Sequence, residues 1–314
     1  MKIGLITPPE VIAITPLADL IQHAIQAEQD GFDSFWFVQL PSGGCDVLTT
    51  IALAGQQTSR IELGTGVVPT YPRHPLVMAQ QALTTQAATN GRLTLGLGLS
   101  HQPVVENMMG LSYERPARHM REYLSVLGPL LQQEPVDYEG DFFRVNASMN
   151  VPEASPCSVV VAALAPLMLK AAGELADGTV TWMGGPKAIE THVALKINEA
   201  AKGAGRPQPR VCVGLPIAVT DDSEAAREYV ADKLAIYGQL VNYRRLLDMD
   251  GAAGPADIAI MGDEQSVTQQ LGDLAEAGAT DFIASIFPVG DDANASIQRT
   301  RQLLASLSAN NSKA

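Results

Sequence analysis

The chain is poor in positive charge and in cysteine. Its 314 residues carry 21 Lys and Arg against 34 Asp and Glu, a formal net charge of −13. Nucleic acids and anionic membranes bind basic patches, so this balance argues against both as partners. The three cysteines, Cys45, Cys157 and Cys212, lie far apart and lack the spacing of a zinc or redox motif. Their odd number excludes complete pairing, and reduced thiols fit a cytoplasmic location.

Long hydrophobic runs are also missing. The longest apolar stretch, residues 159–169, is interrupted by Pro166 and is shorter than the roughly 20 residues that cross a bilayer. The N-terminus reaches Pro8-Pro9 before an apolar signal-peptide core. We therefore expect neither a membrane span nor secretion by that route. With 46% hydrophobic and 18% charged residues, the composition is that of an ordered globular protein.

The sequence does contain a repeated alternation of short β-branched runs with segments of helical period, which is typical of βα units and a parallel sheet. The expected strands are 2–7, 34–38, 61–68, 93–99, 158–163, 179–182, 211–219 and 281–286. The expected helices are about 16–30, 46–58, 76–88, 115–131, 166–176, 186–202, 223–247, 264–277 and 295–307. Eight such units predict an α/β fold, a closed (β/α)8 TIM barrel.

The chain is interpreted as a single domain, 1–314. It has an insertion at about 132–156, after the fourth helix, and a polar tail at 308–314. The alternative is a doubly wound sheet, which would require a glycine-rich turn after the first strand, where Thr7-Pro8-Pro9 stands. Gly96-x-Gly98 comes later and lacks the third glycine of a dinucleotide motif. The barrel is therefore favoured.

The residues at the expected strand ends carry little charge. They include no carboxylate pair with glycosidase spacing, no cluster suited to a metal and no Ser-His-Asp set. In a TIM barrel, function belongs to these positions. A neutral, apolar rim suits a large planar cofactor that brings its own reactivity.

Five segments, kept in order along most of the chain, together resemble the luciferase-like monooxygenase superfamily of flavin and deazaflavin barrels. They are Gly31–Trp36, Leu63–Pro75, Gly91–Gly98, Ala172–Thr179 and Ala275–Phe282. Tyr71–Pro75 and Arg115–Tyr123 are most similar to the branch that uses coenzyme F420, a deazaflavin. The resemblance implies a single luciferase-like barrel. Because relatives are often dimers, it also leaves a homodimer open.

The resemblance also implies where a cofactor would bind. Gly66–Val67 matches a non-proline cis peptide that lies against the cofactor ring, although without the family an ordinary glycine that ends a strand would be the favoured interpretation. Free N–H groups at the helix that opens at Pro166 would hold a phosphate, and a plain helix start is the alternative. The full set of expected cofactor contacts is Gly66, Val67, Leu99, Ser100, Ala163, Leu164, Ala165 and Thr181.

His101 is the candidate catalytic residue. It follows the fourth strand, where some deazaflavin relatives carry a carboxylate proton donor, and histidine can transfer a proton near neutral pH. It could also hydrogen-bond the ring or bind substrate. Gln39 and Leu40 replace an acidic residue and a histidine of relatives, which argues against a proton relay there. The other histidines are expected at the surface, and the arginines of helix 115–131 form a solvated face or reach an acidic cofactor tail.

The leading hypothesis is an oxidoreductase that uses coenzyme F420 to exchange a hydride with a small organic substrate. A second hypothesis keeps the fold but uses FMN and oxygen, as a monooxygenase. A third is a barrel that binds flavin or a metabolite without turnover. None of the three requires a metal.

Overall fold

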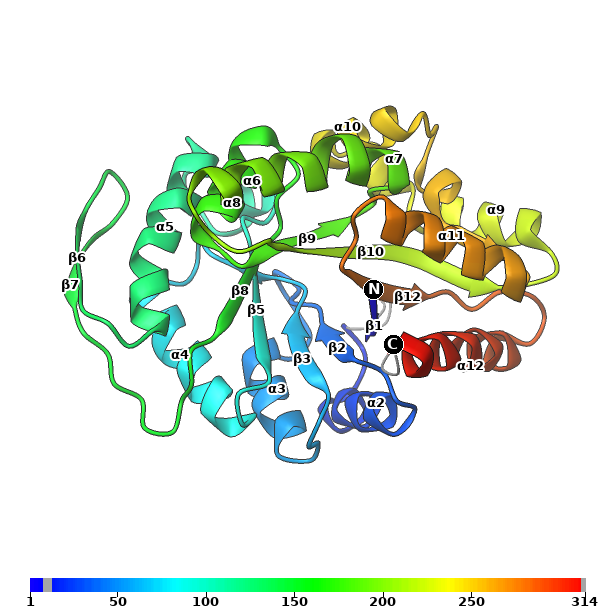
Figure 1. Cartoon of the computed structure of the whole chain (residues 1–314), viewed down its shortest axis with the longest axis horizontal. Helices are drawn as coiled ribbons and strands as arrows, with labels where there is room; N and C mark the ends of the chain where they lie inside the picture. Colours follow the sequence, from blue (N-terminus) through cyan, green and yellow to red (C-terminus); the bar gives the residue numbers. More distant parts are fainter. Residues whose placement is uncertain (8–12, 312–314) are drawn as a thin grey trace.

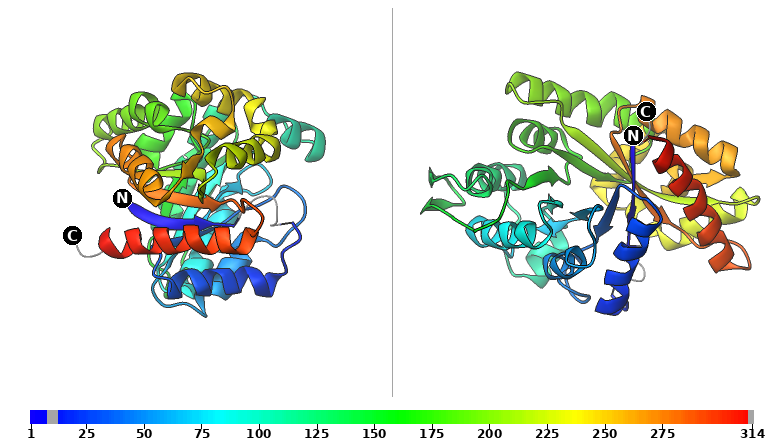
Figure 2. Two further views of the ribbon diagram at one scale, coloured as in Figure 1. Left: turned by 90° about the vertical axis from the view of Figure 1, so that its right-hand side faces the viewer. Right: turned by 60° about the horizontal axis from the view of Figure 1, so that its bottom comes forward.

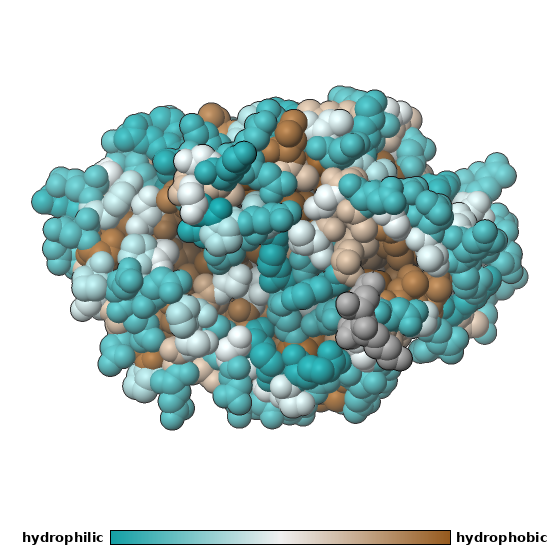
Figure 3. All heavy atoms as spheres, viewed as in Figure 1, coloured by the Kyte–Doolittle hydropathy of each residue, from teal (hydrophilic) through white to brown (hydrophobic). Residues whose placement is uncertain are grey.

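The structure of this protein is a computed structural model that describes residues 1–7 and 13–311. The Pro8-Pro9 pair and the last three residues of the expected tail lie outside the described residues. No helix in the described part is long and apolar enough to span a bilayer. On the face drawn in Figure 3, hydrophilic side chains cover most of the helices, and hydrophobic ones show mainly in the hollows between them.

Eight parallel strands close into a barrel surrounded by helices (Figures 1 and 2). The strands are, in the order of their pairing, β1 (Lys2–Ile6), β2 (Ser34–Phe37), β3 (Glu62–Thr65), β5 (Leu93–Gly98), β8 (Ser158–Val161), β9 (Gly178–Trp182), β10 (Arg210–Val219) and β12 (Asp281–Ile286). The ring closes because β1 pairs with both β2 and β12. The expected (β/α)8 TIM barrel and its eight strands are thus confirmed.

Three further pairings lie outside the ring of eight strands. The strand expected at 61–68 is interrupted at Gly66–Val67, after which β4 (Val68–Pro69) pairs with β5. The short strand β11 (Ile260–Gly262) pairs with the end of β10. Between the fourth helix and β8, β6 (Val136–Glu139) and β7 (Arg144–Ala147) form an antiparallel hairpin.

Helices cover the outside of the barrel. They are α2 (Leu17–Gln29), α3 (Val47–Gly55), α4 (Pro75–Ala88), α5 (Pro116–Leu131), α6 (Pro166–Leu175), α7 (Pro186–Ala188), α8 (Leu195–Gly203), α9 (Ser223–Lys233), α10 (Val241–Asp250), α11 (Glu264–Glu276) and α12 (Ala293–Asn311). Several starts follow from local chemistry. The carboxylates of Asp46, Asp222 and Asp263 accept N–H bonds from the first turns of α3, α9 and α11.

Two expected helices differ from the structure. The long helix at 223–247 is broken into α9, the 3-10 turn η3 (Ala235–Gly238) and α10, with Gly238 at the break. The segment at 186–202 contains a π-helical stretch, η2 (Ile189–Ala194), between α7 and α8. Both departures lie on the same side of the molecule (Figure 1). The periodic pattern predicts a continuous helix in each segment, because the pattern does not show where a tertiary contact turns the chain.

The expected polar tail at 308–314 is partly wrong, because α12 continues to Asn311. Ser308 is fully buried, and its hydroxyl oxygen lies within hydrogen-bond distance of two acceptors, the Gly31 carbonyl oxygen at 3.2 Å and Asp33 Oδ2 at 3.0 Å. The helix packs beside β1, so it joins the C-terminal segment to the first strand (Figure 2). Polar composition predicted a solvated tail, but these buried hydrogen bonds hold the helix onto the barrel.

The barrel interior is filled in layers. At the amino end of the strands, Arg210 reaches across to Glu62 and Asp281, with Nη2–oxygen distances of 2.8 and 2.6 Å. Above it lies an apolar layer that includes the Trp36 indole, for which Gly64 leaves room. Because side chains alternate between the two faces of a strand, every second residue of each strand points into the barrel. The other members of the apolar layer are Val160, Val180, Cys212 and Ile283.

Candidate active site

The floor of the barrel mouth is apolar and open. Ile6, Val67 and Ala162 pack on the inner apolar layer but are only partly buried. They come from β1 and from the ends of β3 and β8, so they surround the centre of the barrel at its carboxyl end. A flat apolar floor at this end of a TIM barrel is suited to binding a planar ring.

Val67 is held in this floor by its neighbours. The Gly66–Val67 peptide bond is cis, which confirms the conformation expected at this position. The Val67 side chain lies over the glycines of β5, and a β-carbon at Gly98 would lie 2.5 Å from Val67 Cγ2. A β-carbon at Gly96 would collide with the Thr65 carbonyl oxygen. Gly96 and Gly98, which do not form a dinucleotide-binding motif, therefore make space for Val67.

The turn between β8 and α6 borders the same floor. Ala165 is the N-cap residue of α6 and provides no side-chain cap, and Pro166 occupies the first turn. The turn is fixed from behind by His192, whose Nε2 lies 2.8 Å from the Leu164 carbonyl oxygen. Backbone N–H groups and the helix dipole at such an end favour an anion. Leu164 and Ala165 are both partly exposed beside the floor.

Two residues of the expected cofactor set point away from the mouth. Ala163 is fully buried, and Thr181 is 3% exposed. Because Val180 faces the barrel interior, the alternation along β9 turns Thr181 toward the helices. The same alternation along β8 puts Ala162 on the inner face in place of Ala163. Position at a strand end, from which both contacts were predicted, does not show which face the side chain takes.

Leu99, Ser100 and His101 follow β5 at the rim. Leu99 packs against the outer core, and Ser100 has a φ of 63°, a left-handed conformation that turns the chain sharply as it leaves the strand. The Ser100 carbonyl accepts a bond of 3.4 Å from the Tyr113 hydroxyl. His101 is partly buried, and burial lowers the pKa of its imidazole from the usual 6.5. Its ring is therefore neutral at pH 7.

An aromatic wall, defined as Trp182, Tyr237 and Tyr243, stands beside His101. The ring centroids of His101 and Tyr243 are 6.0 Å apart, those of Tyr243 and Tyr237 are 5.2 Å apart, and those of Tyr237 and Trp182 are 6.0 Å apart. All these pairs meet edge to face, an arrangement that aromatic rings favour. Tyr237 and Tyr243 come from the broken segment η3–α10. Neither tyrosine was expected at the site, because the periodic pattern predicts one continuous helix over residues 223–247.

The other histidines were only partly assigned correctly. His119, expected at the surface, is 5% exposed and stacks on Tyr71 with a centroid distance of 4.2 Å and an interplanar angle of 7°. Its Nε2 lies 3.2 Å from Thr70 Oγ1, and burial lowers its pKa to about 4. His192, also expected at the surface, is 5% exposed as well. His74 is exposed and caps α4 through Nδ1.

The arginines of α5 are engaged in ion pairs. Arg115 and Arg118 contact Asp141 in the β6–β7 hairpin, and Arg118 also contacts Glu122 on its own helix. The Glu122 carboxylate in turn accepts backbone N–H bonds from residues 141–143, and these bonds lower its pKa against the effect of burial. Arg121 pairs with Glu174 of α6. These contacts fasten the hairpin and α6 to α5.

Gln39 is likewise occupied within its own loop. Its Nε2 donates to the Leu40 carbonyl at 3.0 Å, and its Oε1 accepts from the Val47 N–H at 3.2 Å. The side chain thus shapes the β2–α3 connection.

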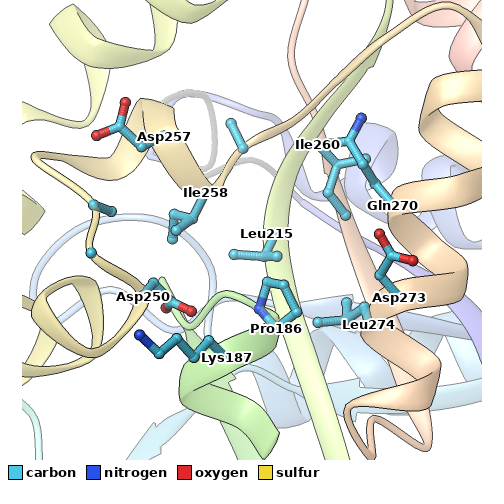
Figure 4. Close-up of a pocket in the computed structure, with 13 residues that line it drawn as sticks. Pro186, Lys187, Leu215, Asp250, Asp257, Ile258, Ile260, Gln270, Asp273 and Leu274 are labelled. Carbon is cyan, nitrogen blue, oxygen red and sulfur yellow. The ribbon is translucent and has the colours of Figure 1, made fainter.

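A separate cavity of about 410 Å³ lies on the outer side of β10, between α7, α10 and α11 (Figure 4). Leu215 faces it from β10, and Asp250 lies on its wall. The Asp250 carboxylate already accepts N–H bonds from Gly185 and Ala188, at 2.8 and 2.9 Å. The carboxylate therefore connects α7 to α10. The cavity is separated from the barrel mouth by the strand itself.

The model of the family described as luciferase-like monooxygenase matches residues 1–308. This chain belongs to the luciferase-like monooxygenase family. It is 30% identical, over 72% of its length and 69% of the relative, to a 5,10-methylenetetrahydromethanopterin reductase of Methanolobus tindarius. The proteins similar to this chain include both reductases and monooxygenases.

Two solved structures show the same luciferase-like fold. One is the coenzyme F420 dependent tetrahydromethanopterin reductase of Methanopyrus kandleri, with a TM-score of 0.75, 24% identity and 97% of each chain covered. The other is the oxygenating constituent of 3,6-diketocamphane monooxygenase from Pseudomonas putida in complex with FMN. It has a TM-score of 0.76 and 20% identity, and the match covers 98% of this chain and 97% of the other.

Proposed function

We propose that this protein is an oxidoreductase that uses coenzyme F420 to exchange a hydride with a small organic substrate. The observation that carries the proposal is the neutral, apolar floor of Ile6, Val67 and Ala162, bordered by the uncapped start of α6. The relatives named as methylenetetrahydromethanopterin reductases favour the deazaflavin over FMN. When bound, the deazaflavin supplies two-electron hydride chemistry, since a carbon replaces the flavin nitrogen that permits radical and oxygen chemistry.

The residues present fit such a group. Val67 and Ala162 would support one face of the ring, and Gly98 keeps that face flat. Pro166 has no N–H, and the Met168 and Leu169 N–H groups donate to the Ala165 carbonyl, so the Leu167 N–H and the helix dipole would hold the phosphate. Ser100, at the sharp turn after β5, borders the same opening. Ala163 and Thr181, whose side chains face outward, would contribute through the backbone alone.

His101 is the proposed proton-transfer residue. It lies at the rim between the floor and Tyr243, and within the described residues its ring nitrogens carry no hydrogen bond that would occupy them. Burial keeps the ring neutral at pH 7. A neutral imidazole can accept a proton from a substrate hydroxyl, and in the reverse direction the imidazolium can return it to a substrate oxygen. The ring nitrogen is the atom that exchanges the proton.

Cofactor titration tests the proposal directly. The purified chain is titrated with coenzyme F420 and, separately, with FMN, and binding is followed by fluorescence. We expect F420 to bind at least tenfold more tightly, and the reduced cofactor to be oxidised under anaerobic conditions by a carbonyl or enone acceptor. Tight FMN binding with oxygen consumption would instead make the protein a monooxygenase. Tight F420 binding without turnover across the acceptor panel would make it a binding protein.

The location and assembly of the protein stay predictions. A cytoplasmic location follows only from the reduced cysteines, of which Cys157 and Cys212 are buried. Light scattering of the purified chain measures its mass in solution and so tests for a homodimer.

A further inference from the structure

The cavity on the outer side of β10 is a space that the proposed function does not use. Its volume of about 410 Å³ falls within the range of small-molecule sites, roughly 300–1,000 Å³. It is formed by β10, β11, α7, α10, α11 and the 3-10 turn η4 (Pro255–Ile258). Because β10 separates it from the barrel mouth, a ligand in this cavity would not compete with the cofactor.

The floor of the cavity is apolar. Leu215 lines it from β10, Ile260 from β11 and Leu274 from α11, and each is no more than 4% exposed. Ile258 of η4 adds a fourth branched side chain (Figure 4). Since apolar surface gains free energy when it leaves water, this floor favours a ligand with an apolar body.

The edge of the cavity is acidic. Asp250 and Asp257 lie on one side of it and Asp273 lies on the other, with Leu215 between them (Figure 4). Among the described residues that line the cavity, Lys187 carries the only positive charge. Three carboxylates thus share the edge with one ammonium, and the excess of negative charge favours a cationic ligand.

Two of these carboxylates have an oxygen to spare. Asp257 Oδ2 accepts from the backbone N–H groups of Ala253 and Gly254, at 2.6 and 3.1 Å, and Asp273 Oδ1 accepts from Gln269 Nε2 at 2.8 Å. Within the described residues, none of the carboxylates at this edge forms an ion pair. The other oxygens of Asp257 and Asp273 therefore keep their lone pairs for a donor that a ligand brings.

The arrangement distinguishes between kinds of ligand. In the described part of the chain, no group of three His, Cys, Asp or Glu side chains is placed to hold a metal ion. An anion would be repelled by the carboxylates of the edge. Burial raises the pKa of Asp250 from its usual 3.8, more than its backbone N–H bonds lower it, so a cation beside this carboxylate would favour its charged form.

We infer that this cavity binds an amphiphilic organic cation, with its ammonium group at the acidic edge and its apolar body on the floor of Leu215 and Ile258. A primary ammonium has three N–H donors, which suit carboxylate oxygens on more than one side of a cavity. The site is separate from the barrel mouth, and the inference does not depend on the proposed function.

The test compares two probes, tryptamine and tryptophol, which share an indole and an ethyl chain and end in an ammonium and a hydroxyl, respectively. Calorimetric titration of the full-length protein near physiological ionic strength measures both affinities. We expect tryptamine to bind about tenfold more tightly, because hydrogen bonds between charged groups are the stronger ones. Salt at about 1 M should remove most of this difference, since it screens charges at an open edge.

Two substitutions at the edge should act in opposite directions. Asp273→Asn removes a negative charge with little change of shape, and it should weaken tryptamine binding about fivefold and leave tryptophol binding within twofold. Lys187→Gln removes the competing cation, and it should strengthen tryptamine binding about threefold. Asp250 is not substituted, because it connects α7 to α10.

Glu199→Gln is the matched control for Asp273→Asn. Glu199 is exposed on α8 and is not among the residues that line the cavity, so the substitution makes the same change in net charge elsewhere. This variant should bind tryptamine within twofold of the wild type. Equal losses in Glu199→Gln and Asp273→Asn would overturn the inference, as would equal binding of the two probes or no detectable binding of tryptamine.

Coenzyme F420 separates this site from the barrel mouth. Tryptamine affinity should stay within twofold when the cofactor is present in excess. A tenfold loss would place the probe in the mouth and overturn the inference. If F420 itself fails to bind but the effects of Asp273→Asn and Lys187→Gln hold, the proposed function fails and the cation site stands.

Discussion

Val67 lies directly over Gly98, so closely that a β-carbon on Gly98 would come within 2.5 Å of Val67 Cγ2. The contact joins the end of β3 to the end of β5 and shapes the floor of the mouth. Gly98→Ala should displace Val67 and lower cofactor affinity about tenfold or more, a loss of about 1.4 kcal/mol of binding free energy. Fluorescence titration measures this change.

Gly272→Ala, on the exposed face of α11, is the control for that substitution, because a β-carbon there meets nothing within 4 Å. It should leave binding unchanged and raise the stability of the helix by up to about 1 kcal/mol. If both variants bind the cofactor equally well, Val67 does not support the ring.

His101→Ala should lower kcat about a hundredfold and leave the cofactor Kd within twofold, because general acid–base catalysis typically contributes that much. The pH profile of kcat should lose a limb whose pKa lies below 6.5, the direction in which burial shifts His101. Gln102→Ala, an exposed neighbour, should behave as wild type. Steady-state kinetics across pH measure these effects. An unchanged pH profile in His101→Ala would contradict the assigned role.

His119 makes stability depend on pH. Its pKa is about 4 in the folded protein, because of burial, against 6.5 when exposed. The unfolded chain therefore binds more protons between these values, and the free energy of unfolding falls as pH falls from 6.5 to 4, by about 3 kcal/mol. His119→Phe keeps the stack on Tyr71 and removes the titration. Denaturant unfolding between pH 6.5 and 4.5 should show a flatter curve for this variant. Equal slopes would refute the assignment.

Arg210→Met should destabilise the fold by about 3 to 5 kcal/mol, because it removes the counter-charge from the buried Asp281 carboxylate and leaves Glu62 with the exposed Lys2 alone. Asp281 has its pKa lowered by Arg210 against the effect of burial, so it is charged at neutral pH. The exposed ion pair of Arg299 and Glu264 provides the contrast. Arg299→Met should lower the free energy of unfolding by about 1 kcal/mol or less, the usual contribution of a surface ion pair. Urea unfolding compares the two. A similar cost for both would mean that the interior pair is solvated.

Much of the fold followed from local patterns. The eight strands and most helices were predicted because each βα unit carries its own hydrophobic period and its own helix start, as at Asp46 and Asp263. The broken segment at 223–250 was not, because the turn at Gly238 places Tyr237 and Tyr243 against partners that are distant in the sequence. Similarly, the hydrogen bonds that bury Ser308 involve Gly31 and Asp33, far away in the chain.

The candidate site divides in the same way. The sequence by itself determined the barrel, the neutral strand ends and the place of His101, since these depend on residue type at known points of a repeating unit, and the family resemblance added the cis bond at Gly66–Val67. Only the tertiary structure decided which face each residue presents: Ala162 inward in place of Ala163, Thr181 outward, and Trp182 beside Tyr237. The reason is that strand alternation, closure of the barrel and the return of η3–α10 over its mouth bring these groups together from distant segments.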